Sequence, residues 1–196
     1  MSRIAPLDPP YAPSIAEMLA KWMPPGADVE PLKLFRTMAV HEELTARMRP
    51  LGAGILGSDR VPARLRELVI HRTCARCGAE YEWGVHAAAF GRPLGFTDEQ
   101  LRATVEGGSG VDCWSEDEVL VLRLADELHD TGRLTDSTFE GLRTHFTDAQ
   151  ILEFAICAGW YHVISFVIGT AEVEPEPWAE PYPGGHAPSD GQLAAG

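Results

Sequence analysis

The sequence predicts an all-α protein, and three observations support this fold class. Apolar residues recur every three or four positions in most segments, which is the spacing of one face of a helix. Capping-box spacings stand at the start of two of these segments. No segment shows the alternation of apolar and polar residues that indicates a strand. We expect seven or eight helices in a compact multi-helix domain over 14–172, between an extended arm over 1–13 and a Pro/Gly-rich tail over 173–196.

In the N-terminal third of the chain, the sequence pattern predicts an arm followed by short helices. Four prolines favour extended chain over 1–13, and a first helix ends near Met23. A second helix begins after Pro31, where the apolar residues return to helical spacing. We expect Pro50 to interrupt this helix, because proline cannot donate its backbone hydrogen bond, and a short helix to follow over 51–57.

The next stretch carries the strongest helical pattern. Asp59 suits an N-cap and Pro62 an early helical position of a segment that runs over 61–90. A joint is expected at Cys77-Gly78, because glycine ends helices readily. This part of the chain therefore predicts two consecutive buried helices.

Capping residues indicate where the next two helices begin. Thr97 with Gln100 and Ser115 with Glu118 have the spacing of capping boxes. Two further helices are predicted over 135–145 and 148–169. The last is apolar enough to resemble a membrane span, but it contains a glutamate and a histidine, so we interpret it as a buried helix.

Composition narrows the class of function. The 196 residues carry a formal net charge of −13, which disfavours binding to nucleic acids and to anionic membranes. Four spread cysteines are too few for a disulfide framework, and the N-terminus shows no secretory signal. We expect a cytoplasmic protein that acts on a small molecule.

Four residues in the 61–90 segment are candidates for acid–base chemistry, because titratable groups stand there at helical spacings among apolar residues: Glu67, His71, Glu82 and His86. Glu82 precedes His86 by four positions, so one helix face presents both. A carboxylate in this position can orient an imidazole for proton transfer. The alternative interpretations are a solvated surface pair, or a metal site that combines Glu82 and His86 with Glu67 or His71.

Other candidates carry weaker signals. Cys74 and Cys77 have the C-x-x-C spacing of redox pairs, but Cys74 falls late in a helix, where small apolar fillers are the more frequent role. Tyr81 and His162 are candidates for substrate contacts. The remaining histidines considered lie among polar residues and are predicted to be surface residues: His41, His129 and His145.

Two stretches, residues 64–70 (RLRELVI) and 80–86 (EYEWGVH), resemble the carboxymuconolactone decarboxylase and alkylhydroperoxidase D-like superfamily. The resemblance covers residues 32–170. It implies an all-α fold of paired helices, assembly as a homotrimer or homohexamer, and an active site near a subunit interface.

The resemblance also assigns roles. The peroxidase branch uses a glutamate, two cysteines and a histidine; Glu67 and His86 match, whereas Ala79 and Glu82 stand at the cysteine positions. The decarboxylase branch has a glutamate four residues before its histidine, as Glu82 stands before His86.

We therefore expect a lyase or isomerase that works beside a carbonyl or lactone, with no cofactor and no metal. Its catalytic residues would be Glu67, Glu82 and His86, with substrate contacts from Tyr81 and His162. In that scheme His86 donates a proton or hydrogen bond, Glu82 orients it, and Glu67 shuttles the proton. A thiol peroxidase that uses Cys74 and Cys77, and a non-catalytic binding protein, remain alternatives.

Overall fold

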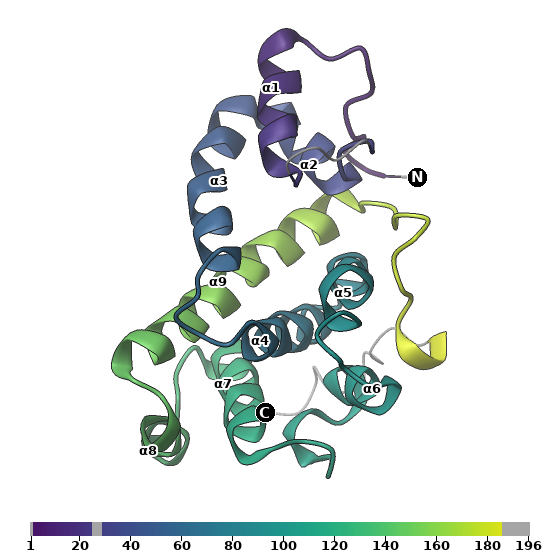
Figure 1. The fold of residues 1–196 in the computed structure, drawn as a ribbon. Helices are drawn as coiled ribbons and strands as arrows, with labels where there is room; N and C mark the ends of the chain where they lie inside the picture. The colour runs from purple at the N-terminus through teal and green to yellow at the C-terminus, as the bar shows by residue number, and fades with distance from the viewer. Residues whose placement is uncertain (1, 25–28, 186–196) are drawn as a thin grey trace. The chain divides into compact units, whose positions relative to one another are not determined.

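The computed structural model describes residues 2–24 and 29–185, and these residues form helices and connecting segments without strands (Figure 1). Its α-helices are α1 (Pro13–Trp22), α2 (Lys33–Met38), α3 (Glu42–Leu56), α4 (Ala63–Arg76), α5 (Glu80–His86), α6 (Asp98–Glu106), α7 (Glu116–Thr131), α8 (Asp136–His145) and α9 (Asp148–Ala171). The all-α prediction is confirmed. The described residues hold nine α-helices instead of seven or eight; the helix predicted after Pro31 is divided into α2 and α3 by a 3-10 turn over Ala39–His41.

The chain forms two compact units. The described residues of Met1–Ser58 and Phe166–Pro177 make the first, and those of Asp59–Ser165 and Trp178–Gly196 make the second. Helix α9 contributes to both. The domain boundaries expected at residues 13 and 172 stay predictions.

In the first unit, α1 packs its apolar face onto the arm and onto the end of α2. Met18 and Leu19 are buried there together with Ala39. The arm is tied down by Arg3, whose N–H donates to the Ala171 carbonyl at 2.8 Å.

The break expected at Pro50 is wrong, because α3 runs through this residue. Proline removes one helical N–H donor, but both sides of α3 are anchored. The Thr45 hydroxyl donates to the Met38 carbonyl at 2.5 Å, and Ile55 is buried. Packing on both sides of the proline therefore holds the helix continuous.

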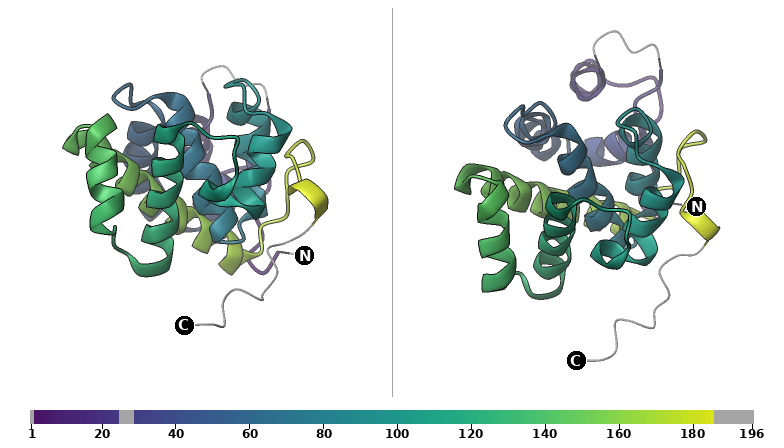
Figure 2. Two further views of the ribbon diagram at one scale, coloured as in Figure 1. Left: turned by 90° about the horizontal axis from the view of Figure 1, so that it is seen from below. Right: turned by 60° about the horizontal axis from the view of Figure 1, so that its bottom comes forward.

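The second unit is built around α4, whose residues from Leu65 to Ala75 are all buried. Figure 1 shows α4 with α5, α6 and α7 around it, and Figure 2 shows α8 beside α7. The helix starts at Ala63 with Pro62 as its N-cap, so the N-cap expected at Asp59 is wrong. The joint after Cys77 is confirmed, since Gly78 has a φ of +66°, a conformation that glycine adopts without strain.

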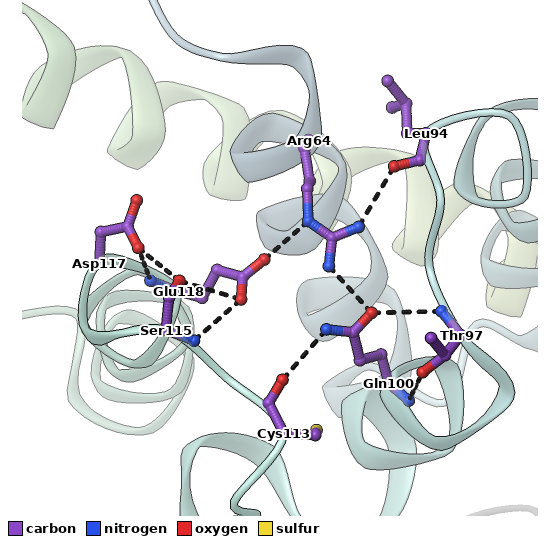
Figure 3. Close-up of polar contacts among 8 residues, drawn as sticks. All are labelled: Arg64, Leu94, Thr97, Gln100, Cys113, Ser115, Asp117 and Glu118. Carbon is purple, nitrogen blue, oxygen red and sulfur yellow. Dashed lines mark hydrogen bonds and ion pairs between the residues drawn. The ribbon is translucent and has the colours of Figure 1, made fainter.

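Both predicted capping boxes are present, and Arg64 joins them (Figure 3). Its guanidinium donates to Glu118 Oε1 at 2.8 Å and to Gln100 Oε1 at 2.9 Å. It also donates to the Leu94 carbonyl at 3.2 Å. One side chain at the start of α4 thereby fixes the N-termini of α6 and α7.

The described part of the Pro/Gly-rich tail that belongs to the second unit packs against α5. The Tyr182 N–H donates to Glu80 Oε1 at 2.8 Å, and the Tyr182 ring is buried. The Glu180 N–H donates to the Gly84 carbonyl at 3.2 Å. A Cβ atom on Gly84 would lie 2.0 Å from the Glu180 carbonyl oxygen, so this close approach of the two backbones requires glycine.

Helix α9 has the length and apolarity of a membrane span, but half of its most apolar window is buried within the protein. Within the second unit, its exposed apolar residues follow one line along the helix: Leu152, Ile156 and Val163. With Gly159 between Ile156 and Val163, their spacing is four, three and four, which is the spacing of a coiled-coil seam. An apolar seam of this length favours packing against another copy of the chain.

We propose that the protein is a homotrimer or homohexamer and that this α9 seam takes part in its interface. Light scattering should give three or six times 21.4 kDa. The substitution Ile156→Glu should lower that mass, because it buries a charge in the seam, whereas Thr144→Glu on exposed α8 should not. A wild-type mass of one chain would refute the proposal.

Candidate active site

The joint between α4 and α5 brings distant residues together. Ala79 donates its N–H to the Cys74 carbonyl at 2.9 Å, which closes the turn and directs α5 back along α4. As a result His86, at the end of α5, lies against Glu67, in the middle of α4. The distance from His86 Nδ1 to Glu67 Oε2 is 2.7 Å.

The other ring nitrogen of His86 faces two further groups. His86 Nε2 lies 3.5 Å from Glu82 Oε1 and 3.1 Å from the Tyr161 hydroxyl, which comes from α9. The structure thus brings Glu67, Glu82 and His86 together. Tyr161 was not among the predicted site residues, because a tyrosine on an apolar helix has the same pattern as a core residue.

The four side chains are almost completely removed from solvent. Exposed fractions are 1 % for Glu67, 7 % for Glu82, 3 % for His86 and 2 % for Tyr161. Glu82 Oε2 is buried and has no hydrogen-bond partner. A buried polar atom without a hydrogen-bond partner costs stability, and a catalytic role is one of the reasons for which proteins keep such atoms.

The two carboxylates determine the charge of His86. Burial alone lowers the pKa of this imidazole, but the charge and hydrogen bond of Glu67, joined by those of Glu82, outweigh burial and raise it to about 10. His86 is therefore an imidazolium at neutral pH, with Nδ1–H donating to Glu67 and Nε2–H directed to Tyr161 and Glu82. Burial, followed by the charge of Glu82, raises the pKa of Tyr161, so this residue remains a phenol.

Phe90 covers one face of the imidazole and is itself partly exposed. Its ring stacks on His86 with centroids 5.0 Å apart, and it is 40 % exposed. It belongs to a π-helical turn, Ala87–Gly91, an irregularity that is common at functional sites.

His71 is a buried neighbour of Glu67 on the same helix. Its Nδ1–H donates to the Glu67 carbonyl at 2.7 Å, and burial lowers its pKa to about 4, so the ring is neutral. The metal site considered for Glu67, His71, Glu82 and His86 is not formed. Within 2–24 and 29–185, three potential ligand atoms come within 4.8 Å of one another at a different place, Cys77, His129 and His162.

Comparison with known proteins supports the relationship that these residues suggest. The model of the carboxymuconolactone decarboxylase family matches residues 42–127, a range that includes Glu67, Glu82 and His86. A peroxidase-related protein from Ralstonia eutropha with an AhpD core is 16 % identical, with 89 % of this chain and 93 % of that chain covered and a TM-score of 0.75. The chain thus matches the carboxymuconolactone decarboxylase family model over part of its length and has the same fold as the AhpD core.

Two other solved structures share the AhpD-like fold. A putative antioxidant defence protein AhpD from Agrobacterium tumefaciens is 18 % identical, with 71 % of this chain and 95 % of that chain covered and a TM-score of 0.65. A debrominase variant in complex with 2,3,4-tribromopyrrole is 16 % identical, with 89 % and 92 % covered and a TM-score of 0.70. No curated protein matches the chain.

The cysteines of this AhpD-like chain differ from a redox pair. Cys74 is fully buried, and burial, with the nearby Glu82, raises its pKa well above the usual value. Burial also raises the pKa of Cys77, although Ser165 and Arg76 offset part of this. Both thiols are therefore protonated at neutral pH, whereas a peroxidatic cysteine acts as a thiolate.

The predicted substrate-binding residues lie in different surroundings. Tyr81 is buried on α5. His162 is half-buried on α9, where its Nε2 lies 3.0 Å from His129 Nδ1. The expectation that His129 is a simple surface residue is wrong, because the end of α7 packs it against His162. The roles of Tyr81 and His162 in binding substrate stay predictions.

Proposed function

We propose that the protein is a cofactor-independent lyase or isomerase that moves a proton beside a carbonyl or lactone. The observation that carries this proposal is the buried imidazolium of His86, held between Glu67 and Glu82, with one oxygen of Glu82 unpartnered. A positive donor beside a carboxylate with a vacant acceptor is the arrangement that enolate chemistry requires.

Each residue has a distinct role in this chemistry. Glu67 keeps His86 charged and holds its ring in place. This role differs from the one expected from the sequence, in which Glu67 shuttles the proton. Glu82 accepts the proton that leaves the carbon next to the carbonyl, and the His86 Nε2–H donates a hydrogen bond to the enolate oxygen that forms. Glu82 then returns the proton to the other end of the conjugated system, which completes an isomerisation.

Decarboxylation uses the same groups. When an unsaturated lactone loses CO₂, the electron pair of the broken C–C bond moves into the lactone carbonyl and forms a dienolate. His86 stabilises the oxygen of this dienolate and supplies the proton that carbon takes up; solvent then restores the imidazolium. The debrominase of similar fold binds a bromopyrrole, which supports a small, planar, unsaturated ring as the substrate class.

Two alternatives are less well supported. A thiol peroxidase is disfavoured because Cys74 and Cys77 are protonated and neither takes part in the contacts of His86 described above. A non-catalytic binding protein would use the unpartnered Glu82 oxygen only to hold its ligand, and it would not need a proton donor and a proton acceptor side by side.

The proposed function is tested with a butenolide that carries a carboxyl group at its γ-carbon and with an unsaturated lactone that can only isomerise. Wild-type protein should turn over at least one of them. Glu82→Gln and His86→Gln should each lower kcat by about 10²–10⁴-fold, because each removes a proton-transfer group.

The matched control is Glu140→Gln, an exposed glutamate on α8, which should retain wild-type activity. No turnover of either compound by the wild-type protein, or equal turnover by Glu82→Gln, would overturn the proposal.

A further inference from the structure

A second cluster of functional side chains lies outside the His86 site. Cys77 follows the last residue of α4, His129 stands in the last turn of α7, and His162 lies on α9. The Cys77 Sγ lies 3.8 Å from His129 Nδ1, and His129 Nδ1 lies 3.0 Å from His162 Nε2. All three side chains are half-buried.

These distances are close to those between the ligand atoms around a bound metal ion. Around a tetrahedral zinc ion, two nitrogen ligands lie about 3.3 Å apart, and a nitrogen and a sulfur about 3.6 Å apart. The observed separations of 3.0 Å and 3.8 Å differ from these values by a few tenths of an ångström. All three atoms lie within 4.8 Å of one another, so side-chain rotations would bring them to one ion.

The hydrogen bond of His162 orients its ring for metal binding. The Nδ1 of His162 lies 2.8 Å from the Ala158 carbonyl, to which it donates, so its Nε2 carries the lone pair that faces the cluster. Histidine ligands in metal sites are commonly held in this way by a second acceptor.

The charges around the cluster permit a cation. Arg76 is the nearby positive group, and it forms ion pairs with Asp126, at 3.7 Å, and with Asp130. Its charge is thereby offset beside the cluster. The Cys77 thiol, whose pKa burial raises, must lose its proton when a metal binds.

We propose that Cys77, His129 and His162 form a binding site for a divalent transition-metal ion of the zinc type. Two imidazoles and one thiolate suit zinc and cobalt, while magnesium and calcium require oxygen ligands. Three protein ligands leave a fourth position for water or for another ligand, as in zinc sites that take part in chemistry or in metal transfer.

The test is a titration of the metal-free, full-length protein with Co²⁺. One equivalent should bind per chain and produce d–d bands in the visible range together with a thiolate-to-cobalt charge-transfer band in the near ultraviolet. About one proton should be released for each ion bound, and Zn²⁺ should abolish both sets of bands.

Variants assign the ligands. Cys77→Ser should remove the charge-transfer band, and His162→Gln should weaken Co²⁺ binding at least about tenfold. The matched controls are Cys113→Ser, a half-buried free thiol elsewhere, and His145→Gln, an exposed histidine, and both should bind like wild type. Absence of binding by wild-type protein, or a charge-transfer band that persists in Cys77→Ser, would refute the proposal.

Discussion

Replacing Glu67 by glutamine is expected to lower the pKa of His86 by several units. Burial alone favours the neutral imidazole, and the charge and hydrogen bond of Glu67 are the strongest of the contributions that reverse this preference. The isosteric amide keeps the volume and a hydrogen bond but removes the negative charge. With Glu82 alone at 3.5 Å, the ring should become neutral near physiological pH or below.

NMR titration of labelled histidine side chains measures this effect directly. Wild-type His86 should keep its imidazolium signals until pH approaches 10. Glu67→Gln should move the transition down by several units, and Glu82→Gln should move it less, because Glu82 lies further from the ring. Glu140→Gln should leave it unchanged. A His86 transition near pH 6.5 in the wild-type protein would show that Glu67 does not control the ring.

The stability of the protein should fall as pH rises from about 6.5 to about 10. The pKa of His86 is about 6.5 in the unfolded chain and about 10 in the fold, so the folded protein holds a proton that the unfolded chain releases in this range. The contribution is fully present below pH 6.5 and is lost as pH passes 10. Its slope reaches about 1.4 kcal/mol per pH unit.

Urea unfolding across this range, for wild type and for His86→Gln, isolates the contribution. The comparison is needed because buried groups with raised pKa values, such as Cys74 and Tyr161, change stability in the same direction. The difference in the free energy of unfolding between the two proteins should shrink as pH rises. A constant difference from pH 6.5 to pH 10 would contradict the charged state assigned to His86.

The helices were predictable where local chemistry decides them. The capping boxes at Thr97 and Ser115 and the joint at Gly78 depend on neighbouring residues, and these predictions are confirmed. The break expected at Pro50 is wrong because packing on both sides of the proline outweighs its local cost. The docking of Tyr182 was not predicted, since a Pro/Gly-rich composition does not reveal contacts with distant helices.

The sequence also predicted those contacts of the candidate site that lie within one helix, and it did not predict those between distant helices. Glu82 and His86 share one helix, so their four-residue spacing indicates that they are neighbours. The match of Glu67 and His86 to one catalytic set came from the family resemblance, because their spacing in the sequence does not show how α5 folds back on α4. Tyr161 and the pairing of His129 with His162 depend on the path of α9, and local spacing in the sequence does not show that path.

The central claim is that the chemistry depends on the imidazolium of His86 and not on the thiols. The most direct measurement compares turnover of the carboxylated lactone by wild type, by His86→Gln and by the double variant Cys74→Ser with Cys77→Ser. The double variant should remain within a few-fold of wild type, and His86→Gln should lose about 10²-fold or more. Rapid reduction of an organic hydroperoxide by wild type that disappears in the double serine variant would contradict this account.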